Sequence, residues 1–105
     1  MNLTSIPAHH ADVASAIADD EAVLILPSKG RVQVLNAVGT RVWQLIDARR
    51  SVAEIVDQIC REYEVEPEQA ARDTTGFLAD LLAKGLVTAR SRGEAGAGTT
   101  AGAEP

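Results

Sequence analysis

The chain has few of the residues on which secreted and membrane-spanning proteins depend. Its single cysteine, Cys60, has no partner for a disulfide or a thiolate metal site, so nothing requires an oxidising compartment. No apolar run approaches the ~20 residues that cross a bilayer. The first residues also lack the basic start and apolar centre of a signal peptide. We therefore expect a cytoplasmic protein that does not insert into membranes.

Positive charge is also scarce. Ten Lys and Arg residues stand against 15 Asp and Glu residues, which gives a formal net charge of -5. Affinity for nucleic acid comes from clustered Lys and Arg residues that release counterions from phosphate. The balance therefore argues against a nucleic-acid partner, and it favours basic partners over acidic ones.

Length and composition predict one small domain. The chain has 105 residues, of which 46% are hydrophobic, and a domain of this size has little room for an elaborate active-site cleft. Residues 91–105 contain no large apolar side chain and are predicted to be a disordered tail. Residues 1–9 contain Pro7 and show no periodicity, so they are predicted to be flexible. The folded domain is expected over residues 10–90.

The pattern of apolar residues predicts strands followed by helices. A weak strand begins near Val13, and residues 21–26 and 31–35 form a hairpin with its turn at 27–30. Asn36 can cap a first helix, Ser51 and Glu54 form a capping box for a second, and Pro67 suits the first turn of a third that ends at Gly85. Leu86 and Val87 are then expected to pack back on the core. The predicted fold class is α+β.

No residue set in the sequence predicts catalysis, a metal site or a cofactor. His9 and His10 are adjacent and would point apart on a strand, and the acidic residues from 12 to 21 lack the spacing of a calcium loop. Cys60 has no nearby His to activate it and is interpreted as a packing residue. Residues 28–30 resemble a phosphate loop only superficially, because the preceding glycine spacing is missing.

A binding surface remains as the functional prediction. A small sheet covered by helices on one side leaves an edge strand, and the strand at 31–35 could accept an extended peptide by strand addition. The flank of the third helix beside it combines apolar and acidic residues. Gly76 on this flank either admits a close-packed ligand side chain or is merely tolerated, since glycine costs about 1 kcal/mol in a helix interior.

Three runs in the sequence resemble the PqqD-like family, also called RiPP recognition elements. They are LNAVGTRVWQLID, SVAEIVDQICREYEVEPEQAARD and FLADLLAKGLV, in the order and spacing of that family. The resemblance implies a winged helix-turn-helix, with a three-stranded antiparallel sheet followed by three helices. It also implies a non-catalytic peptide chaperone, which binds the leader segment of a ribosomally made precursor peptide and delivers it to a modifying enzyme or leader protease.

The resemblance further implies where the leader lies, in a groove between the third strand and the third helix. Carried over by position, the groove residues are Arg31, Val32, Gln33, Val34 and Leu35 on the strand, and Asp73, Gly76, Phe77, Asp80 and Lys84 on the helix. Asn36, Gly39, Trp43 and Asp47 match the family motif but are interpreted as cap, close packing, core and helix end. The run from Thr74 to Gly76 departs from the larger apolar residues common in the family, which predicts a shallower apolar pocket.

Three further questions stay open at the level of sequence. The pathway served could be that of a lasso peptide, which we favour, or of a quinone cofactor. A winged fold could instead bind DNA, although Glu68, Asp73 and Asp80 on the third helix would repel phosphate, and Arg41, Arg49 and Arg50 lie elsewhere. The domain could also dock on a folded partner without any peptide cargo.

Overall fold

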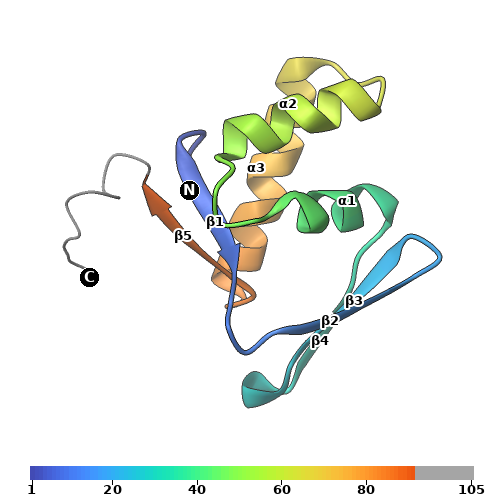
Figure 1. Cartoon of the computed structure of the whole chain (residues 1–105), viewed down its shortest axis with the longest axis vertical. Coiled ribbons are helices and arrows are strands. Elements are labelled where there is room, and N and C mark those ends of the chain that lie inside the picture. Colours follow the sequence, from blue (N-terminus) through green and yellow to red (C-terminus); the bar gives the residue numbers. More distant parts are fainter. Residues whose placement is uncertain (92–105) are drawn as a thin grey trace.

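The computed structural model describes residues 1–91 and has the predicted α+β architecture. A three-stranded antiparallel sheet is followed by three helices (Figure 1). The strands are β2 (Ala14–Ala18), β3 (Glu21–Leu26) and β4 (Arg31–Val34), and the helices are α1 (Ala37–Leu45), α2 (Val52–Glu62) and α3 (Pro67–Ala83). Residues 92–105, most of the predicted tail, lie outside the described residues.

Local sequence signals set where the helices begin. The side chain of Asn36 accepts a hydrogen bond from the backbone N–H of Gly39 at 2.8 Å, which caps α1. Both hydrogen bonds of the capping box between Ser51 and Glu54 are present at the start of α2. Pro67 occupies the first turn of α3, where its missing N–H has no intrahelical acceptor. These three predictions are confirmed.

The turn between β3 and β4 is a single turn of 3-10 helix, η1 (Pro27–Lys29). It ends at Gly30, whose φ of 58° lies in the left-handed region that glycine adopts without strain. The turn holds β3 and β4 in register, with Leu26 opposite Arg31 and Val23 opposite Val34.

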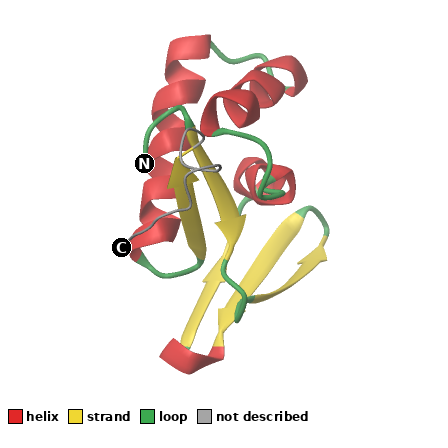
Figure 2. Cartoon of the chain, turned by 60° about the vertical axis from the view of Figure 1, so that its left-hand side comes forward, coloured by secondary structure: helices red, strands yellow, loops and turns green. Residues whose placement is uncertain are grey.

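The expected flexibility of residues 1–9 is wrong for residues 5–9, because they form a strand. This strand, β1 (Ser5–His9), pairs antiparallel with β5 (Val87–Ser91), so that Ser5 lies opposite Ser91 (Figure 2). Ser5, Ile6 and Pro7 are buried. The two strands are about 80 residues apart in sequence, and neither shows alternation strong enough to predict a strand alone.

The start of the chain is also fixed to the second helix. The carbonyl oxygen of Leu3 accepts a hydrogen bond from the backbone N–H of Ala53, at 2.9 Å, in the first turn of α2. Pro7 fits in β1 because the hydrogen bond from His10 N–H to Leu86 sets the phase of the ladder, so that the nitrogen of Pro7 faces away from β5.

The core lies between the helices and one face of the three-stranded sheet. Its large, fully buried side chains come from every layer: Leu24, Leu26, Val42, Trp43, Ile55, Leu78, Leu81 and Leu86. Leu86 and Val87 are buried, as predicted. Over residues 1–91, no helix has the length and apolar character needed to cross a membrane.

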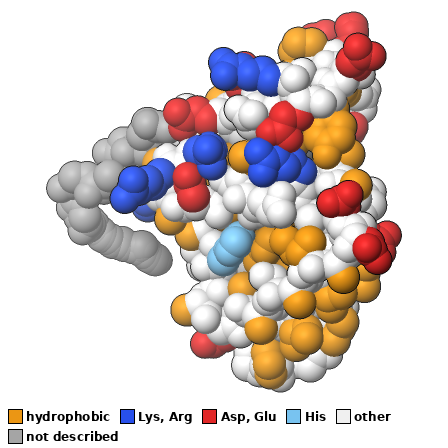
Figure 3. All heavy atoms as spheres, turned by 45° about the vertical axis from the view of Figure 1, so that its right-hand side comes forward, with side chains coloured by type: hydrophobic (Ala, Val, Ile, Leu, Met, Phe, Trp, Pro, Cys, Tyr) orange, Lys and Arg blue, Asp and Glu red, His pale blue; other side chains and the backbone are white. Residues whose placement is uncertain are grey.

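The other face of the three-stranded sheet has no covering layer within residues 1–91. Val32 and Val34 are 64% and 62% exposed, and Ile25 opposite Val32 is 41% exposed. Hydrophobic side chains accordingly gather over the sheet in the lower part of Figure 3. Such an apolar face on a small soluble domain is a feature of interaction surfaces.

Candidate functional site

The outer edge of β4 presents unpaired backbone groups. The strand order is β2-β3-β4, so β4 has a neighbour on one side only among the described residues. The N–H of Leu35 donates to the carbonyl oxygen of Ala22 at 2.8 Å, and pairing groups recur at every second residue of an antiparallel ladder. Arg31 and Gln33 therefore point their backbone groups at β3. The N–H and C=O groups of Val32 and Val34 point outward.

Side chains of β4 alternate between the two faces of the sheet. Arg31 and Gln33 share the inner face with Leu26 and Leu24, which lie opposite them on β3. Val32 and Val34 project from the uncovered face. The valine side chains, which we expected to flank the groove, lie on the face of the sheet that points away from α3. A strand added at this edge would pair with the outward backbone groups of the two valines and would meet their side chains on the uncovered face of the sheet.

A hollow lies between the start of α1 and the middle of α3. Its volume is about 320 Å³, and it is lined by Asn36, Val38, Gly39, Val42, Asp73, Thr74 and Phe77. Asp73 and Phe77 were predicted groove residues. The α1 side of the hollow was not predicted as binding surface, since Asn36 and Gly39 were interpreted as structural. The only indication of this surface in the sequence was Gly39, a small residue within the family motif.

Gly39 is both a structural residue and a wall of the hollow. A Cβ atom built at this position would lie 3.3 Å from Cζ of Phe77 and 3.2 Å from Oδ1 of Asn36. The absence of a side chain therefore lets the half-buried Phe77 ring lie directly on α1. The predicted capping role of Asn36 is confirmed, and Asn36 has a second role because it also lines the hollow.

The opposite end of the groove is bridged by polar contacts between β4 and α3. Nζ of Lys84 donates to Oε1 of Gln33 at 3.1 Å and lies 2.9 Å from Oδ2 of Asp80. Gln33 on β4 and Lys84 on α3, both predicted groove residues, are therefore in contact. The chain directions of β4 and α3 are opposite, so that Lys84 lies beside Gln33 and Asp73 lies near Asn36. The groove therefore runs between the polar bridge and the hollow.

Two predicted groove residues lie at its margins. Leu35 is only 2% exposed and belongs to the core. Gly76 is exposed on α3, and a Cβ atom there would meet nothing within 4 Å. The side chain of Asp73 accepts a hydrogen bond from Gln69 at 2.9 Å, which holds the carboxylate at the rim of the hollow.

An ion pair holds α1, one wall of the hollow, against α2. The guanidinium of Arg41 makes two contacts of 2.7 Å with the carboxylate of Glu62. The hydrogen bond from Arg41 is the main reason that the pKa of Glu62 falls to about 2 from 4.5, and a second bond from Gln58 adds to it. A bidentate pair of this kind also fixes the relative orientation of the two helices.

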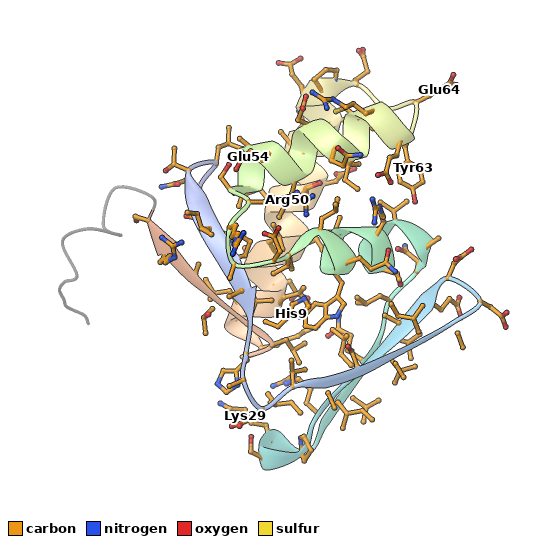
Figure 4. All side chains as sticks on the ribbon, in the orientation of Figure 1. His9, Lys29, Arg50, Glu54, Tyr63 and Glu64 are labelled. Atoms are coloured by element: carbon orange, nitrogen blue, oxygen red, sulfur yellow. The ribbon has the colours of Figure 1, made fainter. Side chains whose placement is uncertain are left out.

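Trp43 and Asp47, which match the family motif, have structural surroundings. Trp43 is 2% exposed, and the imidazole of His9 stacks on it with ring centroids 3.7 Å apart. Figure 4 shows His9 reaching from β1 toward α1. Asp47 accepts hydrogen bonds from the N–H groups of Arg49 and Arg50, which lower the pKa of its carboxyl group.

Reactive side chains do not converge at the groove. Within residues 1–91, no group of three or more His, Cys, Asp or Glu residues could hold a metal ion. Cys60 is a free, half-buried thiol on α2. What the groove does offer is a free strand edge, an apolar hollow at one end and charged side chains at the other. This combination suits recognition of an extended peptide.

The fold and the groove define a winged helical module with an open sheet edge, and comparison with known proteins identifies its family. Residues 21–87 match the family described as Coenzyme PQQ synthesis protein D (PqqD). The chain therefore belongs to the PqqD family. The PqqA binding protein of Rhodopseudomonas palustris (strain BisB5) is 32% identical over 66 residues. These residues make up 63% of each protein, so the match spans less than two thirds of that relative.

Solved structures share the fold. The structure described as TbiB1 in complex with the TbiA(beta) leader peptide has 40% sequence identity and a TM-score of 0.72, over 76% of this chain and 93% of that one. Lasso peptide synthetase B1 complexed with the leader peptide also has a TM-score of 0.72, over 79% and 98% of the two chains. Its identity is 24%, so this second likeness concerns the fold alone.

Proposed function

We propose that the protein binds the leader segment of a ribosomally synthesised precursor peptide and presents it to a modifying enzyme or a leader protease. In this proposal the leader adds to β4 as a further strand, either antiparallel or parallel. The protein binds the leader without cleaving or modifying it. The observation that carries the proposal is the free backbone edge at Val32 and Val34, which lies beside the hollow between α1 and α3.

The dimensions of the groove suit a short extended segment. From Asp73 to Lys84, α3 is about 16 Å long, because an α-helix rises 1.5 Å per residue. An extended strand covers this length with about five residues, at roughly 3.3 Å each. A hollow of about 320 Å³ is at the lower limit for pockets that enclose whole small molecules. It therefore suits one large apolar side chain of a peptide better than a cofactor.

The family and the relatives support the same proposal. One relative is named for binding PqqA, and TbiB1, at 40% identity, was solved with a leader peptide. The lasso-peptide pathway is our preferred assignment, with quinone-cofactor synthesis as the other pathway that the family name suggests. The exposed carboxylates on α3, including Asp73 and Asp80, disfavour DNA as the ligand.

The decisive experiment is a titration of fluorescently labelled leader peptides, read by anisotropy at two salt concentrations. The panel contains the TbiA(β) leader and the leader of any precursor encoded beside the gene. We expect saturable binding at or below the micromolar range, with much less dependence on salt than binding to duplex DNA would show. Salt-sensitive binding to duplex DNA and none to any leader would overturn the proposal.

Strand addition is tested separately with Val34→Pro, because proline removes the backbone N–H that faces the free edge. Val34→Thr is the matched control, since it keeps the N–H and a β-branched side chain. We expect leader affinity to fall in the proline variant and to persist in the threonine variant. Thermal melting establishes that both are folded. Equal affinity in two folded variants would rule out strand addition at this edge.

A further inference from the structure

One end of the groove is basic, although the chain as a whole is acidic. Lys84 contacts Gln33, and Arg31 lies two residues from Gln33 on the same face of β4. The side chain of Lys29 passes within 3.7 Å of the Cβ position of Gly85, next to Lys84. Figure 4 shows Lys29 at this end of the sheet. The three cations contrast with the net charge of -5.

Arg31 is the cation of this end that has a buried and unsatisfied donor. Its Nε atom is buried and forms no hydrogen bond within residues 1–91. The side chain also forms no ion pair within the described part of the chain. Enclosing an unsatisfied donor is unfavourable, and a guanidinium carries five donors in a planar fork that matches a carboxylate. A carboxylate brought by a ligand would satisfy it.

Lys84 is partnered, but by groups that can release it. Its contact with Asp80 is an i,i+4 pair on the surface of α3, in which the two side chains are 34% and 51% exposed. Pairs of this kind contribute little to stability. Its other contact is with the neutral amide of Gln33. A ligand carboxylate at Arg31 could therefore recruit Lys84 as a second donor.

We propose that this end of the groove selects leaders that carry an Asp or Glu side chain, held by Arg31 and Lys84. The inference rests on the leader-binding function proposed above and adds a requirement on the sequence of the leader. Since side chains of a strand alternate, residues that face the groove are separated by even numbers. The acidic residue should lie four or six positions from the apolar residue that enters the hollow, because Arg31 is five residues before Asn36 at the hollow and the separation must be even.

The experiment is a substitution scan of the TbiA(β) leader, in which Glu, Gln or Lys replaces each residue in turn. Each labelled peptide is titrated by anisotropy against the full chain. We expect one groove-facing position at which Glu binds roughly ten-fold more tightly than Lys, with Gln between them. The preference should weaken as salt is raised, because part of the ion pair is exposed.

Charge reversal then assigns the preference to this end of the groove. In Arg31→Glu, the peptide with Lys at the selected position should bind better than the one with Glu. Arg61→Glu is the matched control, since Arg61 lies on α2 with a side chain 70% exposed and gives the same change in net charge. It should leave the preference for Glu unchanged.

The two proposals fail in different ways. Leader binding with no position that prefers Glu would overturn the acidic requirement and leave the leader-binding function intact. A preference that persists in Arg31→Glu would overturn it as well. If a folded protein bound neither any peptide of the scan nor the leader of a precursor encoded beside the gene, the leader-binding function itself would be overturned.

Discussion

The ring of Phe77 rests on Gly39, with Cζ 3.3 Å from the position that a Cβ atom would take. This contact joins α1 to α3, and both residues line the hollow. Any side chain at position 39 would displace either the ring or the capping side chain of Asn36. The same small residue thus determines helix packing and the space open to a ligand.

Gly39→Ala should weaken leader binding without unfolding the protein. The added methyl group pushes Phe77 into the hollow, and we expect affinity to fall roughly ten-fold, as for other changes of one carbon in an apolar pocket. Alanine favours a helix by about 1 kcal/mol over glycine, which offsets part of the cost of the close contacts. Anisotropy titration and thermal melting measure the two effects. Unchanged affinity would remove the α1 wall from the site.

Gly76→Ala tests whether the bound leader packs against α3 at this position. A methyl group there meets nothing within 4 Å in the free protein, so it should stabilise α3 by about 1 kcal/mol. If the leader packs closely against Gly76, which is one of the two interpretations that the sequence leaves open, affinity should fall several-fold despite the greater stability. The measurements are a denaturant titration and leader anisotropy. Affinity equal to that of the natural chain would show that Gly76 lies beyond the leader.

Ile6→Ala should strongly destabilise the domain. Ile6 is 4% exposed, and truncation of a buried Ile typically costs about 2–5 kcal/mol. Leu3→Ala is the control, because Leu3 is 46% exposed and its contribution to the fold shown here is the backbone bond to Ala53. It should cost less than about 1 kcal/mol. Equal losses in urea unfolding would contradict the burial of β1.

Glu62→Gln should remove one source of acid sensitivity. The pKa of Glu62 is lowered to about 2 in the folded chain, from an ordinary value of 4.5. Its contribution to stability is therefore complete above pH 4.5, and it is lost as the pH falls from there toward 2. The melting temperature of Glu62→Gln should lie below that of the natural chain at pH 6, most of this difference should be lost by pH 2.5, and the rest should disappear below pH 2.

The exposed Glu64 provides the control for that comparison. Glu64→Gln changes the net charge equally and leaves the contact between Arg41 and Glu62 in place. Its melting temperature should follow that of the natural chain across the same range of pH. A difference between Glu62→Gln and the natural chain that stays constant down to pH 2.5 would mean that the ion pair does not link α1 to α2 in solution.

The helices could be predicted because their signals are local. Asn36, the pair Ser51 and Glu54, and Pro67 each act on backbone groups within a few residues, so the sequence around them suffices. The pairing of β1 with β5 could not be predicted in this way. Each of these strands depends on a partner about 80 residues away, and Ile6 is the only large aliphatic side chain in β1.

The groove was predicted in part, for a similar reason. Its line along β4 and α3 came from the family resemblance, and the contact between Gln33 and Lys84 agrees with it. The face on which Val32 and Val34 lie depends on the phase of the strand, which only its pairing with β3 determines. The α1 wall depends on how two helices pack, and residues such as Gly39 do not reveal this in isolation.

The antiparallel pairing of Ser5 with Ser91 also has a mechanical consequence. The first residue of β1 and the last residue of β5 lie opposite each other at one end of the ladder, on the side of the molecule away from the three-stranded sheet (Figure 1). A force that pulls residues 5 and 91 apart would therefore open the ladder one hydrogen bond after another, as a zipper opens. Tension applied at residues 5 and 91 should release this pair before any load reaches the strand edge at Val32 and Val34.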